Sequence, residues 1–258
     1  MRIAAIILVG MMAMTAPAVA QRAATGALGD PFVENFTSFD GERWQLSDRY
    51  PPENMFSAVW APAQAAFTPD GLVITLEPTV QPNAPKPYKS AELSSHEEFR
   101  YGYYEARLRA VRGGGIVSGF FTFALPTGPN TENEIDMEII GRAPTQIELT
   151  YHVNGHHIRQ ITPLGFDASE GFHTYAFDWR RDSIRWYIDN RLVHTSRAHV
   201  RELNRPHQIF TSLWNSVRMP IWLGPYDASA GAHTMTVACI AHAPRYSGRA
   251  LCSARAED

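Results

Sequence analysis

Apolar and polar side chains alternate along most of this chain in short runs, with turn residues about every ten positions. Residues 102–110 carry apolar or aromatic side chains at alternate positions, which predicts a half-buried strand. Residues 72–76 follow the turn-forming Pro69-Asp70-Gly71 and predict another strand. Residues 116–123 contain three phenylalanines and predict a strand buried on both faces. No long segment shows the period of a helix.

Residues 183–195 predict a hairpin. Two alternating segments, 183–188 and 191–195, flank Asp189 and Asn190, two residue types that tolerate the positive φ of a two-residue turn. Many strands and few helices in a chain of 258 residues predict an all-β sandwich or barrel. We expect one domain over residues 31–243, because no linker or internal repeat divides it, and we interpret the proline-rich residues 82–87 as a surface loop.

The first twenty residues have the pattern of an export signal. A short basic start precedes an apolar run over residues 3–15, and Ala18-Val19-Ala20 is a typical cleavage site. The apolar run is shorter than the roughly 20 residues that span a bilayer, so we expect a cleavable signal peptide over residues 1–20 and no membrane anchor after its removal. The protein would then be secreted or periplasmic, with a polar segment over residues 21–30 and a C-terminal tail over residues 244–258.

Composition and charge narrow the class of partner. The chain is 45% hydrophobic, enough for one sizeable core, and its formal net charge of -3 gives no electrostatic reason to bind nucleic acid or an anionic membrane. The chain has only two cysteines, Cys239 and Cys252, and they lie close together in the sequence. In an exported chain they predict a structural disulfide that closes the tail, with two free thiols as the alternative.

Glu134, Asp136 and Glu138 alternate with the apolar Ile135 and Met137. In a strand this spacing places all three acids on one face. Like charges so close repel, and at least one pKa should rise, which is costly for stability and typical of a functional site. A solvated acidic face or a helical turn is the alternative, which the β-rich flanks disfavour.

A pair of carboxyl groups with different pKa values is what glycoside hydrolysis requires. One is ionised and attacks the anomeric carbon, and the other is protonated and donates to the leaving oxygen. Asp136 would share a proton with Glu134 and orient it. The spacing favours a retaining over an inverting mechanism.

Residues 133–141, Asn-Glu-Ile-Asp-Met-Glu-Ile-Ile-Gly, resemble the active-site strand of glycoside hydrolase family 16, and in particular its lichenase branch. Further segments that resemble bacterial lichenases follow in the same order: residues 54–60, 90–93, 101–105, 115–122, 165–167, 173–179, 213–215 and 222–224. The resemblance covers about Phe32 to Ala243. It assigns Glu134 as the nucleophile, Glu138 as the acid/base and Asp136 as the assisting carboxylate.

The resemblance implies a concanavalin-like β-sandwich, or jelly roll, of two curved antiparallel sheets with a polysaccharide in the concave cleft. Positions that match family substrate contacts are Tyr50, Asn54, Phe56, Glu92, Thr150, Tyr151, His152, Asn154, Trp214, Asn215 and Trp222. Trp214 and Trp222 are the best candidates to stack on sugar rings. We interpret Trp44, Trp179 and Trp186 as core or sheet-face residues.

Some positions depart from the lichenase pattern. Glu132 replaces a tryptophan that precedes the nucleophile, which indicates a different or charged polymer. Ala58 and Ser90 replace the lichenase disulfide cysteines, and Ala238 replaces the aspartate of the family calcium site. His152, His156 and His157 lie close in sequence without persuasive ligand spacing, and we expect neither a metal nor a cofactor.

The sequence therefore predicts a secreted, monomeric, retaining endo-β-glucanase that hydrolyses β-1,3-1,4-linked glucan or a related polysaccharide. A succinoglycan-type exopolysaccharide depolymerase and a transglycosylase of the same family are alternatives. A non-catalytic glycan-binding sandwich is the alternative from another class, because a fold alone does not fix activity. A binding module, however, has no reason to place a repelling row of acids under its ligand.

Overall fold

The computed structural model describes residues 28–52, 55–80 and 83–252, whose regular secondary structure is almost entirely β-strand. The expected signal peptide, most of the polar segment and the last residues of the tail lie outside the described residues. Within the described ranges, no helix is long and apolar enough to cross a bilayer.

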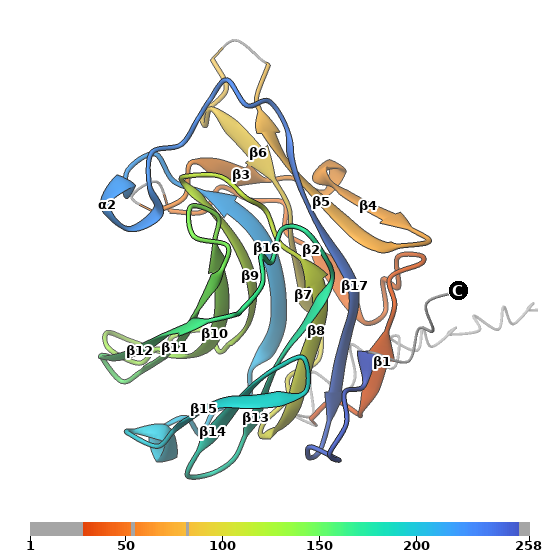
Figure 1. Ribbon diagram of the computed structural model, residues 1–258, viewed down its shortest axis with the longest axis vertical. Helices are drawn as coiled ribbons and strands as arrows, with labels where there is room; N and C mark the ends of the chain where they lie inside the picture. Colours follow the sequence, from red (N-terminus) through yellow and green to blue (C-terminus); the bar gives the residue numbers. More distant parts are fainter. Residues whose placement is uncertain (1–27, 53–54, 81–82, 253–258) are drawn as a thin grey trace, which may run out of the picture.

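Two sheets pack face to face, and Figure 1 shows both of them curved, with the smaller sheet on the concave side. The strand order of the seven-stranded sheet is β12 (His156–Pro163), β11 (Gln146–Val153), β10 (Asn133–Ile140), β9 (Ile116–Phe123), β16 (Gln208–Asn215), β7 (Glu92–Ser95) and β2 (Trp44–Leu46). The ten-stranded sheet has the order β15 (Arg191–Ser196), β14 (Ile184–Ile188), β13 (His173–Trp179), β8 (Gly102–Arg109), β17 (His233–Ala243), β5 (Gly71–Pro78), β6 (Tyr88–Ser90) and β3 (Ala58–Trp60), with β1 (Phe32–Glu34) beside β17 and β4 (Ala65–Thr68) beside β5.

Three short helical segments complete the described chain: η1 (Pro62–Gln64), η2 (Val200–Glu202) and α2 (Pro220–Leu223). Neighbouring strands pair antiparallel except β3 and β6, which are parallel. The predicted all-β sandwich is therefore confirmed.

The hydrophobic core lies between the two sheets. The side chains of Trp44, Trp179 and Trp186 are at most 1% exposed within it, as predicted. The predicted hairpin is confirmed as β14 and β15, and Asp189 and Asn190 form its turn with φ of 46° and 64°. This geometry is that of a type I′ turn, whose twist matches the strands.

The C-terminal tail covers the outer face of β8. The carboxylate of Glu105 is fully buried and accepts hydrogen bonds from the Tyr103 hydroxyl and from the backbone N–H groups of Leu251 and Cys252. Cys252 forms the predicted disulfide with Cys239 of β17, with their Cα atoms 5.7 Å apart. The prediction that β8 is half-buried is therefore wrong, because the tail shields the face that would meet water.

Candidate active site

The three acids lie on β10, a central strand of the seven-stranded sheet, and their strand prediction is confirmed. Ile135 and Met137 point into the core and are at most 1% exposed. Alternation then turns Glu134, Asp136 and Glu138 to the opposite, concave face, where all three line one cleft. The apolar residues between the acids thus hold the row in place.

Glu134 and Asp136 share a hydrogen bond that fixes their ionisation. Burial, followed by the charges of Glu134 and Glu138 and the bond to Glu134, raises the pKa of Asp136 well above its usual range. Asp136 is therefore protonated, and its O–H group donates a hydrogen bond to the Glu134 carboxylate. Burial raises the pKa of Glu134 to about 7, and the bond from Asp136 counteracts this rise. Asp136 thus favours an ionised Glu134.

Glu138 is the acid that stays protonated at neutral pH. Burial, together with the charges of Glu134 and Glu148, raises its pKa to about 8, whereas a hydrogen bond from Trp214 and the charge of Arg159 oppose the rise. A protonated and an ionised carboxyl on one strand face are the arrangement that general-acid and nucleophilic roles require.

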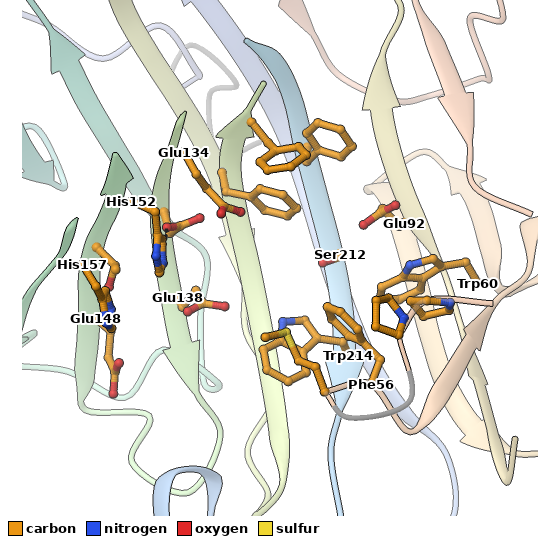
Figure 2. A pocket seen from close by; sticks show the side chains of 18 of the residues that line it. Phe56, Trp60, Glu92, Glu134, Glu138, Glu148, His152, His157, Ser212 and Trp214 are labelled. Atoms are coloured by element: carbon orange, nitrogen blue, oxygen red, sulfur yellow. Dashed lines mark ion pairs between the residues drawn. The ribbon is translucent and has the colours of Figure 1, made fainter. Parts of the chain in front are cut away.

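The cleft has a volume of about 600 Å³, large enough for several sugar units. Figure 2 shows Glu134 and Glu138 pointing into it between His152 on one side and Trp214 on the other. Burial and His157 lower the pKa of His152 to about 4, so this imidazole is neutral at neutral pH. His152 Nε2 lies 3.7 Å from Asp136 Oδ2.

Two aromatic clusters line the cleft. Near Glu138, Phe56 packs against Trp60 and Trp214 with ring centroids 5.6 and 5.1 Å apart, and Trp222 lies 5.9 Å from Trp214. On the side of Glu134, Phe121 and Phe210 stack with centroids 5.0 Å apart, and Phe123 packs edge-on against Phe210. Aromatic faces suit the apolar C–H surfaces of sugar rings.

The cleft charges are paired. Glu92 Oε1 accepts hydrogen bonds from the Ser47 hydroxyl and from Arg49 Nη2, both at 2.7 Å. Glu148 forms an ion pair with Arg159 at 3.0 Å and accepts a hydrogen bond from Trp222 Nε1 at 3.0 Å. The cations that line the cleft are thus engaged by acids of the same chain.

Comparison with known proteins agrees with this geometry. The family model "Glycosyl hydrolases family 16" matches residues 52–237. This chain belongs to glycosyl hydrolase family 16. The matched region contains both sheets' central strands and the whole acid row.

Curated relatives of this family 16 chain include beta-glucanases. One from Bacillus subtilis is 35% identical over 219 residues, which are 84% of this chain and 86% of that protein. One from Acetivibrio thermocellus is 36% identical over 222 residues, 86% of this chain, but the chain spans only 65% of that longer protein.

Solved structures agree on the sandwich. A lichenase from a mouse hindgut metagenome has a TM-score of 0.78 at 29% identity, with 84% of this chain and 100% of that chain covered. The Bacillus licheniformis beta-glucanase has a TM-score of 0.75 at 32% identity, with 83% and 98% covered. The concanavalin-like jelly roll implied by the resemblance is therefore confirmed.

The family 16 cleft contains six of the residues predicted to contact substrate: Phe56, Glu92, Thr150, His152, Trp214 and Trp222. Trp214 is only 5% exposed, since it belongs to one buried cluster with Trp60 and Leu223, and the rings of Phe56 and Trp222 pack against it. Its indole therefore contributes a wall and a hydrogen bond to Glu138 rather than an open platform.

Two predicted substrate contacts are wrong. Tyr151 alternates with Thr150 and His152, so its ring points into the core, where it is 1% exposed and donates to the Ala198 carbonyl. Asn215 follows Trp214 at the end of β16, and its side chain is fully buried and does not line the cleft.

Three further positions do not join the described cleft lining. Tyr50 is 66% exposed and lines a separate shallow hollow with Val80 and Lys86. Asn154 sits in the turn between β11 and β12, where it donates to Glu202, so its predicted sugar contact stays a prediction. Asn54 lies outside the described residues.

The loop beside this hollow differs in one detail from its prediction. Residues 83–87 reach the surface except Lys86, which is 4% exposed and donates to the carbonyls of Pro51 and Phe56 at 2.6 and 2.8 Å. Lys86 thus anchors the segment that carries Phe56 into the cleft.

Glu132 does not line the described cleft. Its carboxylate accepts a hydrogen bond from the backbone N–H of Gly155 at 3.1 Å, which holds it against the β11–β12 turn. Burial is the main cause of the shifted pKa values of Glu134 and His152, but the charge of Glu132 also raises both pKa values. The inference that Glu132 adds charge near the substrate site is therefore supported, and a preference for a charged polymer stays a prediction.

Sequence reasoning missed Glu148, Arg159 and the phenylalanines of the cleft floor. Glu148 has the same parity on β11 as Thr150 and His152, and this alternation is the pattern that predicts its direction into the cleft. The prediction that residues 116–123 are buried on both faces is correct for Phe120 but not for Phe121 and Phe123, which are only partly buried because they line the cleft.

Among the described residues, two groups could hold a metal ion: Glu134, Asp136 and His152 in the cleft, and His156, His199 and Glu202 outside it. In the first group Glu134 and Asp136 are joined by a hydrogen bond, which suits proton transfer between carboxyl groups.

Proposed function

We propose that this family 16 chain is a retaining endo-β-glucanase that hydrolyses β-1,3-1,4-linked glucan. The observation that carries the proposal is that two carboxyl groups on one strand have different protonation states. The hydrogen bond from Asp136 favours an ionised Glu134, while burial and the charge of Glu148 favour a protonated Glu138. These are the two states that a double displacement needs at its start.

In the first step, a Glu134 carboxylate oxygen attacks the anomeric carbon and forms a glycosyl-enzyme ester. The bond to the leaving oxygen breaks, and Glu138 donates its proton to that oxygen. In the second step, the ionised Glu138 takes a proton from water, the water oxygen attacks the same carbon, and Glu134 leaves as a carboxylate. After the second step, Glu134 is again a carboxylate and Glu138 is again protonated.

A neutral polymer fits the cleft better than a charged exopolysaccharide. Arg49 and Arg159 are paired with Glu92 and Glu148, and Glu132 is held by the Gly155 N–H. The remaining surface is largely aromatic, which suits uncharged glucose units. The similarity to beta-glucanases, and to the structure of a β-1,3-1,4-glucanase, supports the same substrate class.

We infer that the enzyme acts outside the cytoplasm as a monomer after removal of residues 1–20. The apolar run and the cleavage pattern of the sequence support export, and the disulfide between Cys239 and Cys252 is compatible with an oxidising compartment. Mass spectrometry of the exported chain should place its first residue at Gln21.

The decisive experiment measures reducing sugar released from barley β-glucan, lichenan, laminarin, xyloglucan and succinoglycan by the wild type and by Glu134→Gln. We expect release from barley β-glucan and lichenan, lost in the variant by about 10⁴-fold or more. Glu170→Gln, on an exposed turn, is the matched control and should retain full activity.

Binding without turnover of any polymer would favour the glycan-binding alternative and refute the enzyme. Turnover of succinoglycan alone would refute the neutral-glucan assignment. Products longer than the starting oligosaccharide, without reducing-sugar release, would show a transglycosylase instead.

A further inference from the structure

Three potential metal ligands meet outside the cleft lining, on segments that lie far apart in the sequence. His156 begins β12, His199 precedes η2, and Glu202 ends η2. One ligand atom from each, two imidazole nitrogens and a carboxylate oxygen, all lie within 4.8 Å of one another. The imidazole rings of His156 and His199 stack with centroids 3.7 Å apart, and His199 Nδ1 lies 2.7 Å from Glu202 Oε1.

Neighbouring groups hold these ligands in place. Asn154 Nδ2 donates to Glu202 Oε2 at 3.1 Å, so each carboxylate oxygen has a partner. His199 adopts a left-handed backbone with φ of 55°, which is uncommon outside glycine, and its ring stacks on that of His156.

A solvated ion pair explains only part of this arrangement. His199 and Glu202 would suffice for such a pair, and a second protonated imidazole stacked on the first would repel it. Two neutral imidazoles and one carboxylate are, by contrast, a common donor set for Zn²⁺, with the fourth position left to water. The hydrogen-bonded second layer from Asn154 is also typical of metal sites.

We propose that His156, His199 and Glu202 bind a divalent transition-metal ion such as Zn²⁺. The ion takes the place of the proton between His199 Nδ1 and Glu202 Oε1 and recruits the exposed ring of His156. It lies apart from the residues that line the cleft.

A bound ion would stabilise the segment of chain that directly precedes Glu134. Asn154 N–H donates to the Glu132 carbonyl at 3.1 Å, and Asn133 Nδ2 donates to the Glu202 carbonyl at 3.4 Å. The ion would therefore join the β11–β12 turn to η2 across the start of β10, the strand that carries Glu134. Its role is structural and does not depend on the proposed glucanase activity.

Isothermal titration of Zn²⁺ into the tag-free, metal-stripped protein tests the site. We expect one ion per chain, with affinity reduced about tenfold or more in His156→Gln and in His199→Gln. His173→Gln is the matched control, because His173 also lies 2.7 Å from a carboxylate, Asp189, but is not part of a three-ligand group among the described residues. His152→Gln tests the cleft group in the same way, and both controls should bind as the wild type does.

Thermal unfolding provides a second readout that does not involve activity. Zn²⁺ should raise the midpoint of the wild type and of His173→Gln but not that of His199→Gln, whereas all three should unfold alike without metal. Absence of zinc binding by the wild type, equal binding by all variants, or loss of binding only in His152→Gln would overturn the proposal.

Discussion

Glu138 and Glu148 occupy directly opposed positions on β10 and β11, and both face the cleft. Glu148 is held by Arg159 and by Trp222 Nε1. Its negative charge helps to raise the pKa of Glu138, so a residue that would not itself react sets the pH range in which the acid keeps its proton.

Replacement of this neighbour should change the pH dependence of activity. In Glu148→Gln the opposing charge is lost and Arg159 is released, and both changes lower the pKa of Glu138 from about 8. Glu138 must be protonated for the first step, so as the pH rises, the variant would lose activity at a lower pH than the wild type does. We expect the alkaline limb of kcat/KM to move down by about one pH unit.

The pH profile of Glu170→Gln should match that of the wild type, because this residue lies on an exposed turn. An alkaline limb that moves upward in Glu148→Gln would contradict the assignment of Glu138 as the acid.

Replacement of Glu138 should stabilise the fold at alkaline pH. Its pKa is about 8 in the folded chain, against an ordinary value of 4.5. Between these values the folded state retains a proton that the unfolded state has released, so stability falls as the pH rises. Glu138→Gln removes this loss.

We expect the free energy of unfolding of Glu138→Gln to exceed that of the wild type by about 4 kcal/mol at pH 8. At pH 4.5 the two proteins should be nearly equal in stability, because the carboxyl group of Glu138 then begins to retain its proton in the unfolded state as well. Urea unfolding at the two pH values measures both. A variant less stable than the wild type at pH 8 would show that the acid row is not a source of strain.

The disulfide should contribute to stability through the tail. It joins residues 13 positions apart and keeps Leu251 and Cys252 on the buried Glu105 carboxylate. We expect Cys239→Ser with Cys252→Ser to lower the free energy of unfolding by about 3 kcal/mol. Reducing agent should destabilise the wild type and leave the double variant unchanged; equal stability of the two proteins without reductant would refute this role.

The sequence predicted the sandwich and the acid row because both rest on alternation. A strand has a fixed side-chain period, so Ile135 and Met137 in the core determine the direction of the acids between them. The same rule, applied to β11, excludes Tyr151 from the cleft and includes Glu148. The error there came from taking consecutive residues of one strand as substrate contacts.

Contacts between distant segments could not be predicted in this way. The meeting of His156 with His199 depends on how the β11–β12 turn packs against η2, and the shielding of β8 depends on the path of the tail. Neither contact leaves a local pattern in the sequence. The departure at Glu132 was visible, but its hydrogen bond to Gly155 required the folded turn.

The central claim is that Glu134 attacks the sugar and Glu138 transfers the proton, on opposite sides of the anomeric carbon. Azide rescue of Glu134→Ala and Glu138→Ala on an activated aryl β-glucoside oligomer, with the product configuration read by NMR, tests it most directly. In Glu138→Ala, azide replaces water in the second step and should give the β-glycosyl azide. In Glu134→Ala, azide replaces the nucleophile and should give the α-glycosyl azide. The opposite pairing of configurations and variants, or rescue of neither variant, would contradict the account.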